Sequence, residues 1–248
     1  MIALADPGRL AQEPVIPEFG QGSDCVRENR QFCWDWFQSR FDDVFWPRIV
    51  EHVELTLIAV GIGFAIAFAA ALFAHRYGWF DTPFTVFSGF LYTVPSLALF
   101  QLLVPITGLT WTSAEIALVS YTLLILFRNT LTGLRGVPED VKEAARGMGL
   151  TTRQILTRVE LPLAFPAIMA GLRIATVTTI SLTTVAAFIG AGGLGQPIFN
   201  ALQGGFKTQF VASGVLAVLL ALIADALLVI VQRVATPWAR ARARVRAA

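Results

Sequence analysis

The chain has few of the groups from which a catalytic or nucleotide-binding site is built. Its only lysines are Lys142 and Lys207, and neither lies in the Gly-Lys-Ser/Thr sequence that a phosphate-binding loop requires. Its only histidines, His52 and His75, stand at opposite ends of one apolar run, so they cannot act as a pair. These absences predict that the chain is not an enzyme and has no catalytic residue, cofactor or metal site of its own.

Charged residues are also scarce, at 15% of the chain, whereas hydrophobic residues make up 55% and the mean hydropathy is +0.64. A length of 248 residues alone would allow one or two soluble domains, but long apolar runs exclude them. The run 82–114 is uncharged and longer than one bilayer crossing needs. We expect an all-α integral membrane protein with five core transmembrane helices, at about 55–74, 82–114, 112–131, 161–188 and 208–231.

A polar segment, 132–160, separates the third and fourth of these spans. It mixes acids and bases, so it has no reason to lie in lipid, and we expect a cytosolic loop with structure of its own. Pro138 stands at a first helical position, with Glu139 and Asp140 against the positive end of the helix dipole. These signals predict a short helix over about 138–146, closed by glycines at 147 and 149. A helix of this length is unstable alone in water, so it needs a partner to dock on.

The loop resembles the EAA loop of the permease subunits of ABC importers, in which the short helix fits a groove on the ATPase. The matching residues are Glu143, Ala144, Ala145, Gly149, Val159, Leu161 and Pro162. The segments 91–100, 128–133, 143–149 and 187–195 are similar to the glycine betaine/carnitine/choline (osmoprotectant) branch of these permeases. The resemblance covers about residues 52–233.

The resemblance implies a type I ABC importer (MetI-like) permease fold in the cytoplasmic (inner) membrane of a bacterium, crossed several times. It implies a dimer of ABC ATPases that binds the ATP and magnesium, a second permease subunit, identical or homologous, and a separate extracytoplasmic substrate-binding protein. No nucleic acid is expected as a partner. Coupling to the ATPase would involve Glu139, Glu143, Ala144, Ala145, Gly149, Leu161 and Pro162. The alternatives are a permease of the same architecture for methionine or another amino acid and, more remotely, a membrane-embedded enzyme.

The distribution of basic residues predicts the orientation. If the loop 132–160 is inside, then twelve of the nineteen basic residues lie in inside segments, and the two outside loops hold only Lys207. Since basic residues favour the cytoplasmic side, we expect the N-terminus outside and the C-terminus inside. The basic tail 234–248 would then lie in the cytosol against anionic membrane lipid. The transmembrane permease domain is 52–233.

The first 51 residues form a different, acid-rich segment, which we expect to be extracytoplasmic. Its aromatic residues recur at spacings of about four, which suits either a helix in the membrane interface or an ordinary helix packed against the bundle. These residues are Phe32, Trp36, Phe37, Phe41 and Phe45. Cys25 and Cys33 are the only cysteines, and an oxidising compartment would permit a disulfide between them, although the spacing does not decide it.

Two charged residues interrupt the fourth and fifth spans. Arg173 and Asp225 come to about the same depth from the same side, roughly 12 Å at the rise of a helix. Because intramembrane charges are costly and usually face a partner or a wet cavity, we expect an ion pair between the two helices. Arg128 is a rival partner for Asp225, and a role of these charges in gating is the functional alternative.

Several other polar and aromatic residues are candidates for a translocation path. Thr176, Thr179 and Thr183 give the fourth span a polar side, which could line a path or hydrogen-bond neighbouring helices. Aromatic faces could attract a quaternary ammonium solute, and the candidates are Tyr92, Phe100 and Tyr121. The sequence Gly-Ala-Gly-Gly-Leu-Gly at 190–195 matches the dinucleotide fingerprint, but no short strand precedes it. We interpret it as a flexible or tight turn at the outer end of the fourth span.

Overall fold

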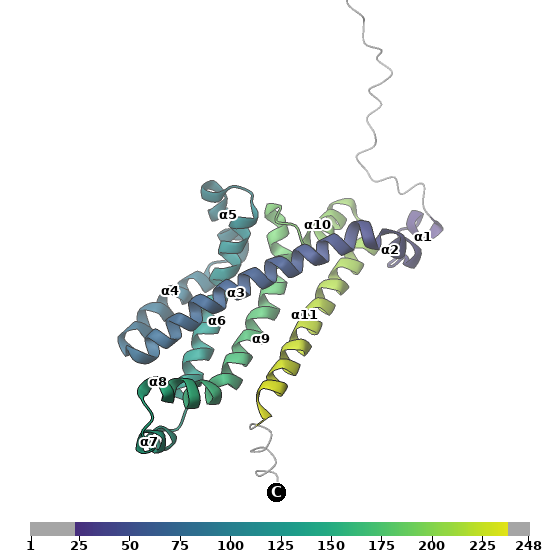
Figure 1. Ribbon diagram of the computed structural model, residues 1–248. Helices are drawn as coiled ribbons and strands as arrows, with labels where there is room; N and C mark the ends of the chain where they lie inside the picture. Colours follow the sequence, from purple (N-terminus) through teal and green to yellow (C-terminus); the bar gives the residue numbers. More distant parts are fainter. Residues whose placement is uncertain (1–22, 238–248) are drawn as a thin grey trace, which may run out of the picture.

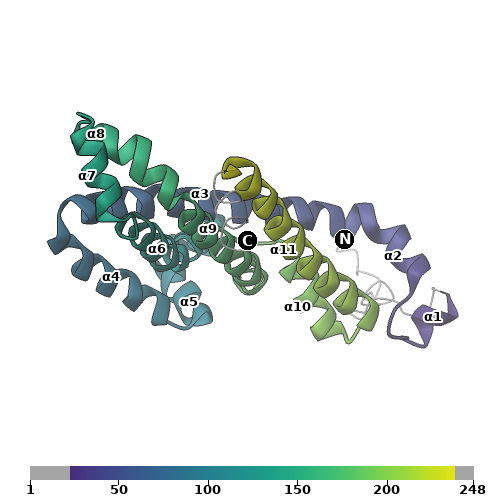
Figure 2. The same cartoon turned by 90° about the horizontal axis from the view of Figure 1, so that it is seen from below.

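The computed structural model describes residues 23–237, which are helical throughout with short connections and contain no strand. Four helices are long and apolar enough to cross a membrane by themselves. Three of them, α6 (Trp111–Arg135), α9 (Leu161–Ala186) and α11 (Lys207–Ala235), lie side by side in that order, while α3 (Trp46–Arg76) runs obliquely across α6 and α9 (Figure 1). Figure 2 shows the same crossing along the bundle from below.

The second apolar run differs in shape from the sequence expectation. The uncharged stretch 82–114 is not one continuous span, because it contains α4 (Asp81–Thr93) and α5 (Ser96–Thr107), which meet at a bend of 97°. Val94 is extended at this bend, as expected for a residue before a proline, and Pro95 has no amide hydrogen to continue the helix. Gly108, with φ of 75°, then ends α5 before α6 begins.

The N-terminal part of the described chain runs into the first long helix without a break. The helices α1 (Asp24–Arg27) and α2 (Trp34–Arg40) come first, and a π-helical turn, Phe41–Phe45, joins α2 directly to α3. The aromatic helix is therefore not a separate element, and the boundary expected at residue 52 falls inside a helix. Some of the aromatic side chains pack against the bundle, since Phe45 is fully buried and the ring of Trp36 lies edge-on to that of Phe206. Phe32, in contrast, is exposed.

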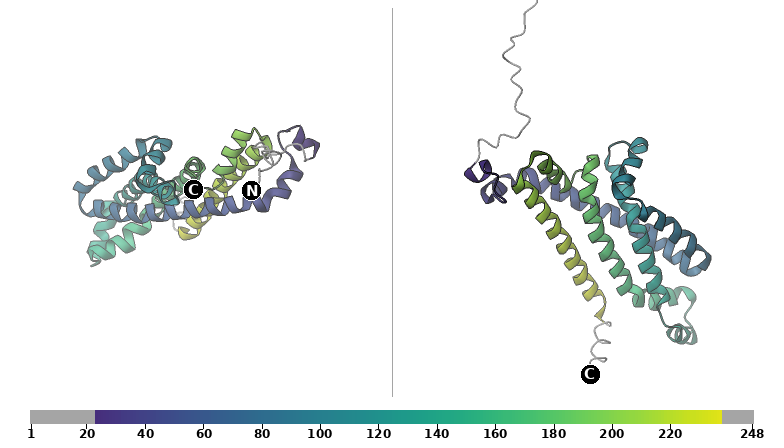
Figure 3. Two further views of the ribbon diagram at one scale, coloured as in Figure 1. Left: turned by 90° about the horizontal axis from the view of Figure 1, so that it is seen from above. Right: turned by 180° about the vertical axis from the view of Figure 1, so that it is seen from behind.

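The two ends of the bundle carry different connections. The first end holds α1, α2, the end of α5 and α10 (Gly195–Gly204), and the second holds α7 (Glu139–Gly147), α8 (Thr152–Ile155) and the last turn of α11 (Figures 1 and 3). A π-helical turn, Leu156–Glu160, leads from α8 into α9, and a 3-10 turn, Ala187–Ile189, ends α9. The expected tail 234–248 lies largely outside the described residues, as do residues 1–22 of the acid-rich segment.

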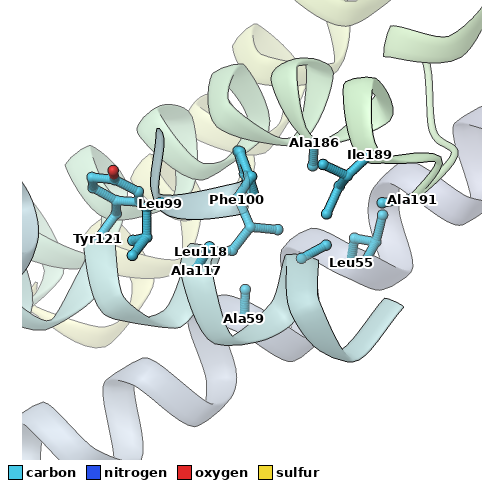
Figure 4. Packing of buried hydrophobic residues seen from close by; sticks show 11 residues of the cluster. Leu55, Ala59, Leu99, Phe100, Ala117, Leu118, Tyr121, Ala186, Ile189 and Ala191 are labelled. Atoms are coloured by element: carbon cyan, nitrogen blue, oxygen red, sulfur yellow. The ribbon is translucent and has the colours of Figure 1, made fainter. Parts of the chain in front are cut away.

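Small residues allow the crossing helices to approach closely. In the core near the first end, Phe100 of α5 and Leu118 of α6 pack with Leu55 and Ala59 of α3 (Figure 4). Farther along, a Cβ atom on Gly63 would lie 1.9 Å from the hydroxyl oxygen of Thr122. Because dispersion contacts rather than exclusion from water hold helices together in lipid, these alanine and glycine contacts fix how α3 and α6 pack.

Candidate functional site

The polar loop forms the most exposed helix of the second end. Pro138 caps α7, which begins at Glu139, within one residue of the start expected from the sequence. The carboxylate of Glu139 accepts from Lys142 Nζ at 2.7 Å and from the Arg146 guanidinium at 2.8 Å. These two bonds, that from Lys142 first, hold the pKa of the Glu139 carboxyl below its ordinary value. They stiffen one side of a helix that is only nine residues long.

The chain leaves α7 through a left-handed glycine. Gly149 has φ of 81°, and the amide of the next residue, Leu150, donates to the carbonyl of Ala145 at 3.2 Å. Such a bond across a left-handed residue is a common way to satisfy the last carbonyls of a helix. Thr151 and Gln154 then form a reciprocal capping box that starts α8. The turn between the two short helices is therefore set by the residue types at its corners.

Most residues of α7 are exposed within the described part of the chain. Ala145 is its only buried residue, while Glu143 and Ala144 are exposed. Met148, directly after the helix, is 73% exposed. Leu161 and Pro162 lie partly buried in the first turn of α9 and do not join the exposed face of α7. Val141 and Lys142 are partly buried, so one side of α7 lies against the described chain, and the side with Glu143 and Ala144 is exposed and could meet a partner.

Replacing Gly149 tests whether this turn positions α7. A valine at Gly149 must adopt a positive φ, which costs roughly 1–2 kcal/mol or more for a β-branched residue and favours a different turn. We expect Gly149→Val to leave the protein in the membrane but to weaken binding of any protein that docks on α7, measured by co-purification.

Two matched changes separate backbone strain from added bulk. Gly149→Asn should retain more binding, because asparagine tolerates the left-handed region. Gly147→Ala should retain it fully, since Gly147 has an ordinary φ and no atom within 4 Å of an added Cβ. Equal losses in all three variants would mean that the conformation of Gly149 does not position the helix.

The intramembrane charges of α9 and α11 meet in the structure. Arg173 Nε donates to Asp225 Oδ1 at 2.7 Å, and its second guanidinium nitrogen donates to Oδ2 at 2.9 Å. Arg128, the rival partner, instead lies 4.0 Å from Asp81, which also binds Arg135. The two-point contact between planar groups fixes the relative position of α9 and α11 more strictly than a single bond would.

The candidate path residues mostly lie inside the subunit. Phe100 and Tyr121 belong to the core cluster, and the Tyr121 hydroxyl donates to the carbonyl of Val94. Only Tyr92, at 41%, is exposed, and its ring lies edge-on to that of Tyr121. Thr176, Thr179 and Thr183 are buried. Thr176 and Thr183 donate to carbonyls one turn back in α9 itself and not to another helix.

Two residues that were not predicted as site residues hold the glycine turn at the first end. Glu51 Oε2 accepts from the amide of Gly193 at 2.9 Å, and His52 Nδ1 accepts from the amide of Leu194 at 3.2 Å. Since Nδ1 accepts, Nε2 carries the proton and donates to the carbonyl of Ile180 at 3.0 Å. Gly192 and Gly193 have positive φ, so the turn is tight and held rather than flexible. A histidine beside an apolar run was the only sequence signal for this arrangement.

A second contact at the first end, which we call the N-terminal clasp, consists of Cys25, Asn29 and Cys33 with the residues they hold. A disulfide joins Cys25 to Cys33. Within the ring that it closes, the Asn29 side chain donates to the carbonyl of Gly205 at 2.8 Å and accepts from the amide of Lys207 at 3.1 Å. The clasp therefore caps the start of α11 with a residue from the other end of the chain.

Comparison with known proteins identifies the class to which this geometry belongs. Residues 58–240 match the family model of the binding-protein-dependent transport system inner membrane component. The chain belongs to this family. It is thus the multi-pass inner-membrane permease of an importer, a transport component rather than an enzyme, and the family's dependence on a binding protein implies that protein and an ATPase as partners.

Individual relatives agree with this assignment along most of the permease. This chain is 38% identical to the osmoprotectant import permease protein OsmW of Salmonella typhimurium, over 75% of its own length and 89% of that protein's. It is 36% identical to the choline transport system permease protein OpuBB of Bacillus subtilis, over 77% and 88%. An inward-facing structure of the MetNI methionine ABC transporter has a chain that matches with a TM-score of 0.67 at 21% identity, covering 78% of this chain and 96% of that one. At 21% identity, this structural similarity establishes the fold alone, and it is the type I importer fold that the sequence predicted.

Proposed function

We propose that this permease imports a quaternary ammonium osmoprotectant of the glycine betaine, choline or carnitine type. The observation that carries the proposal is the relatedness to permeases named for osmoprotectant and choline transport over three quarters of the chain. A permease named for glycine betaine, carnitine and choline, from Bacillus subtilis, is 36% identical over the same share. The methionine alternative is supported by fold alone, at 21% identity.

The second part of the proposal concerns coupling. α7 would dock in a groove of an ABC ATPase dimer, which binds ATP and magnesium, and closure of that dimer would pull on the loop 132–160. The N-terminus would lie outside and the C-terminus inside, which places α7 in the cytosol and the N-terminal clasp on the outer face. A second permease subunit would complete the pathway between two bundles, and the binding protein would deliver the solute at the first end. The exposed side of α7 supports the docking step.

Uptake measurements test the substrate. In cells that lack their own osmoprotectant importers, the permease expressed with its ATPase and binding protein should accumulate labelled glycine betaine, choline or carnitine. Labelled methionine serves as the competing solute. Uptake of methionine and none of the three quaternary ammonium compounds would overturn the assignment.

A charge reversal in α7 tests coupling separately. Glu143→Lys should leave the amount of membrane-inserted permease unchanged, because Glu143 is exposed and makes no ion pair among residues 23–237. Co-purification of the ATPase and substrate-stimulated ATP hydrolysis should both fall, since a docking carboxylate becomes a cation.

Asp35→Lys is the matched control, because it makes the same charge change on an exposed residue of α2 at the first end. It should keep the ATPase bound. Normal stimulation of hydrolysis in Glu143→Lys would remove this residue from the coupling contact.

A further inference from the structure

A pocket of about 540 Å³ opens at the second end, between the last turn of α3 and the chain from the end of α7 to Glu160. α3 contributes Leu72, His75 and Arg76 to its lining, and Arg146, Arg153 and Glu160 lie opposite. Its volume is in the range of pockets that hold small molecules. The pocket shares Arg146 with the exposed surface of α7, and its other lining residues lie outside that helix.

Basic groups dominate the pocket. Three guanidinium groups line it against one carboxylate, that of Glu160, which is buried and bound to His75 Nε2 at 3.1 Å. The Arg146 guanidinium also forms an ion pair with the Glu139 carboxylate, at 2.8 Å. Arg76 and Arg153 have no acidic partner among residues 23–237. The pocket lining therefore carries more basic than acidic groups, and two of its arginines have no acidic partner among residues 23–237.

Aromatic residues place the mouth of the pocket at the membrane boundary. Arg76 is the last residue of α3, and Tyr77 and Trp79, directly after it, are 48% and 69% exposed. Exposed tyrosine and tryptophan at the end of an apolar helix mark the depth of the lipid headgroups. Leu72, one turn deeper in α3, gives the pocket an apolar wall toward the membrane interior.

We propose that this pocket binds the phosphate of an anionic phospholipid headgroup, with Arg76 and Arg153 as its principal ligands. Guanidinium groups bind phosphate oxygens through paired hydrogen bonds, and basic pockets between membrane helices at headgroup depth suit anionic lipids. The glycerol and first acyl carbons of the lipid would lie along Leu72. A zwitterionic lipid brings its own cation, which the surplus of arginine would repel. The bound lipid would link the end of α3 to the loop that carries α7.

Lipid binding to the purified full-length permease tests this proposal. Native mass spectrometry in detergent should show that phosphatidylglycerol binds more tightly than phosphatidylcholine. Arg76→Gln combined with Arg153→Gln should weaken phosphatidylglycerol binding roughly thirtyfold, at about one kcal/mol for each basic residue near an anionic surface. Arg158→Gln is the matched control, because Arg158 is exposed in the turn before α9 and does not line the pocket, and it should bind as the unchanged permease does.

Three results would overturn the proposal. The first is equal binding of phosphatidylglycerol and phosphatidylcholine, and the second is a double variant that binds phosphatidylglycerol normally. In the third, inorganic phosphate displaces phosphatidylglycerol from the pocket at millimolar concentration, which would make the site one for a soluble anion. A double variant that binds the lipid normally and loses the ATPase would assign both arginines to ATPase docking instead.

Discussion

Asp225→Asn is expected to lower the amount of folded permease severalfold. The change leaves Arg173 in α9 without the carboxylate that takes both of its hydrogen bonds, in a helix that crosses the membrane. An unpaired charge in lipid is costly, and removing one partner of such a pair costs more than the pair contributes. Arg173→Gln should also lower the amount of folded permease, because it leaves the Asp225 carboxylate of α11 without its partner. The measurement is the yield of monodisperse permease after membrane extraction, compared with the unchanged protein.

The double variant separates pairing from two independent roles. Arg173→Gln with Asp225→Asn leaves no unpaired charge, so its yield should exceed that of either single variant. If the fractional yield of the double variant equals the product of the two single-variant yields, the residues act independently, which would contradict the pair. A double variant with restored yield and no transport would show that the charges also act during the transport cycle.

Arg128→Gln is the control for this experiment. Arg128 lies at the limit of contact with Asp81, and Arg135 remains to bind that carboxylate. The single change should therefore affect yield little, and combining it with Asp225→Asn should recover nothing.

Gly195→Ala should remove most of the folded permease. A Cβ atom at Gly195 would lie 2.0 Å from the carbonyl oxygen of Thr184 and 2.7 Å from the Cβ of Ala187. Neither neighbour can rotate away, because one is backbone and the other is a methyl group on the turn after α9. Inserting atoms into a packed core usually costs about 1–3 kcal/mol, and a contact this short requires the backbone itself to move. We therefore expect Gly195→Ala to cost about 3 kcal/mol of stability or more.

Gly204→Ala in the same helix is the matched control. Nothing lies within 4 Å of an added Cβ there, and its φ is ordinary, so the change should be neutral or slightly stabilising. Thermal unfolding of the two variants in detergent, followed by intrinsic fluorescence, makes the comparison. Similar melting temperatures for both would mean that the turn after α9 yields more easily than its packing indicates.

The sequence predicts the parts of this permease that depend on local signals. The limits of α7 follow from Pro138, the two acids after it and Gly149, and α6, α9 and α11 follow from apolar runs between polar ends. The break in the second span had a local signal too, because Pro95 stands in the middle of its uncharged run, but length and hydropathy alone do not reveal a bend.

The bonds from Glu51 and His52 to the glycine turn could not be predicted in this way. They join residues 142 positions apart, and neither side chain has a local pattern that indicates a partner. The burial of Phe100 and Tyr121 was missed for the same reason. An aromatic residue in an apolar run can face lipid, a pathway or the core, and only the packing of α5 against α6 decides among them.

The N-terminal clasp has a consequence for how many times the chain traverses the bilayer. Asn29 binds Gly205 and Lys207, so residues near 29 and residues near 206 share one face of the membrane. The polypeptide between them must then traverse the bilayer an even number of times. If α3, α6 and α9 each cross once, this even count requires the bent pair α4 and α5 to supply the fourth pass. The last turn of α11 then lies at the opposite end of the bundle from Asn29, as the helices are arranged in Figure 1.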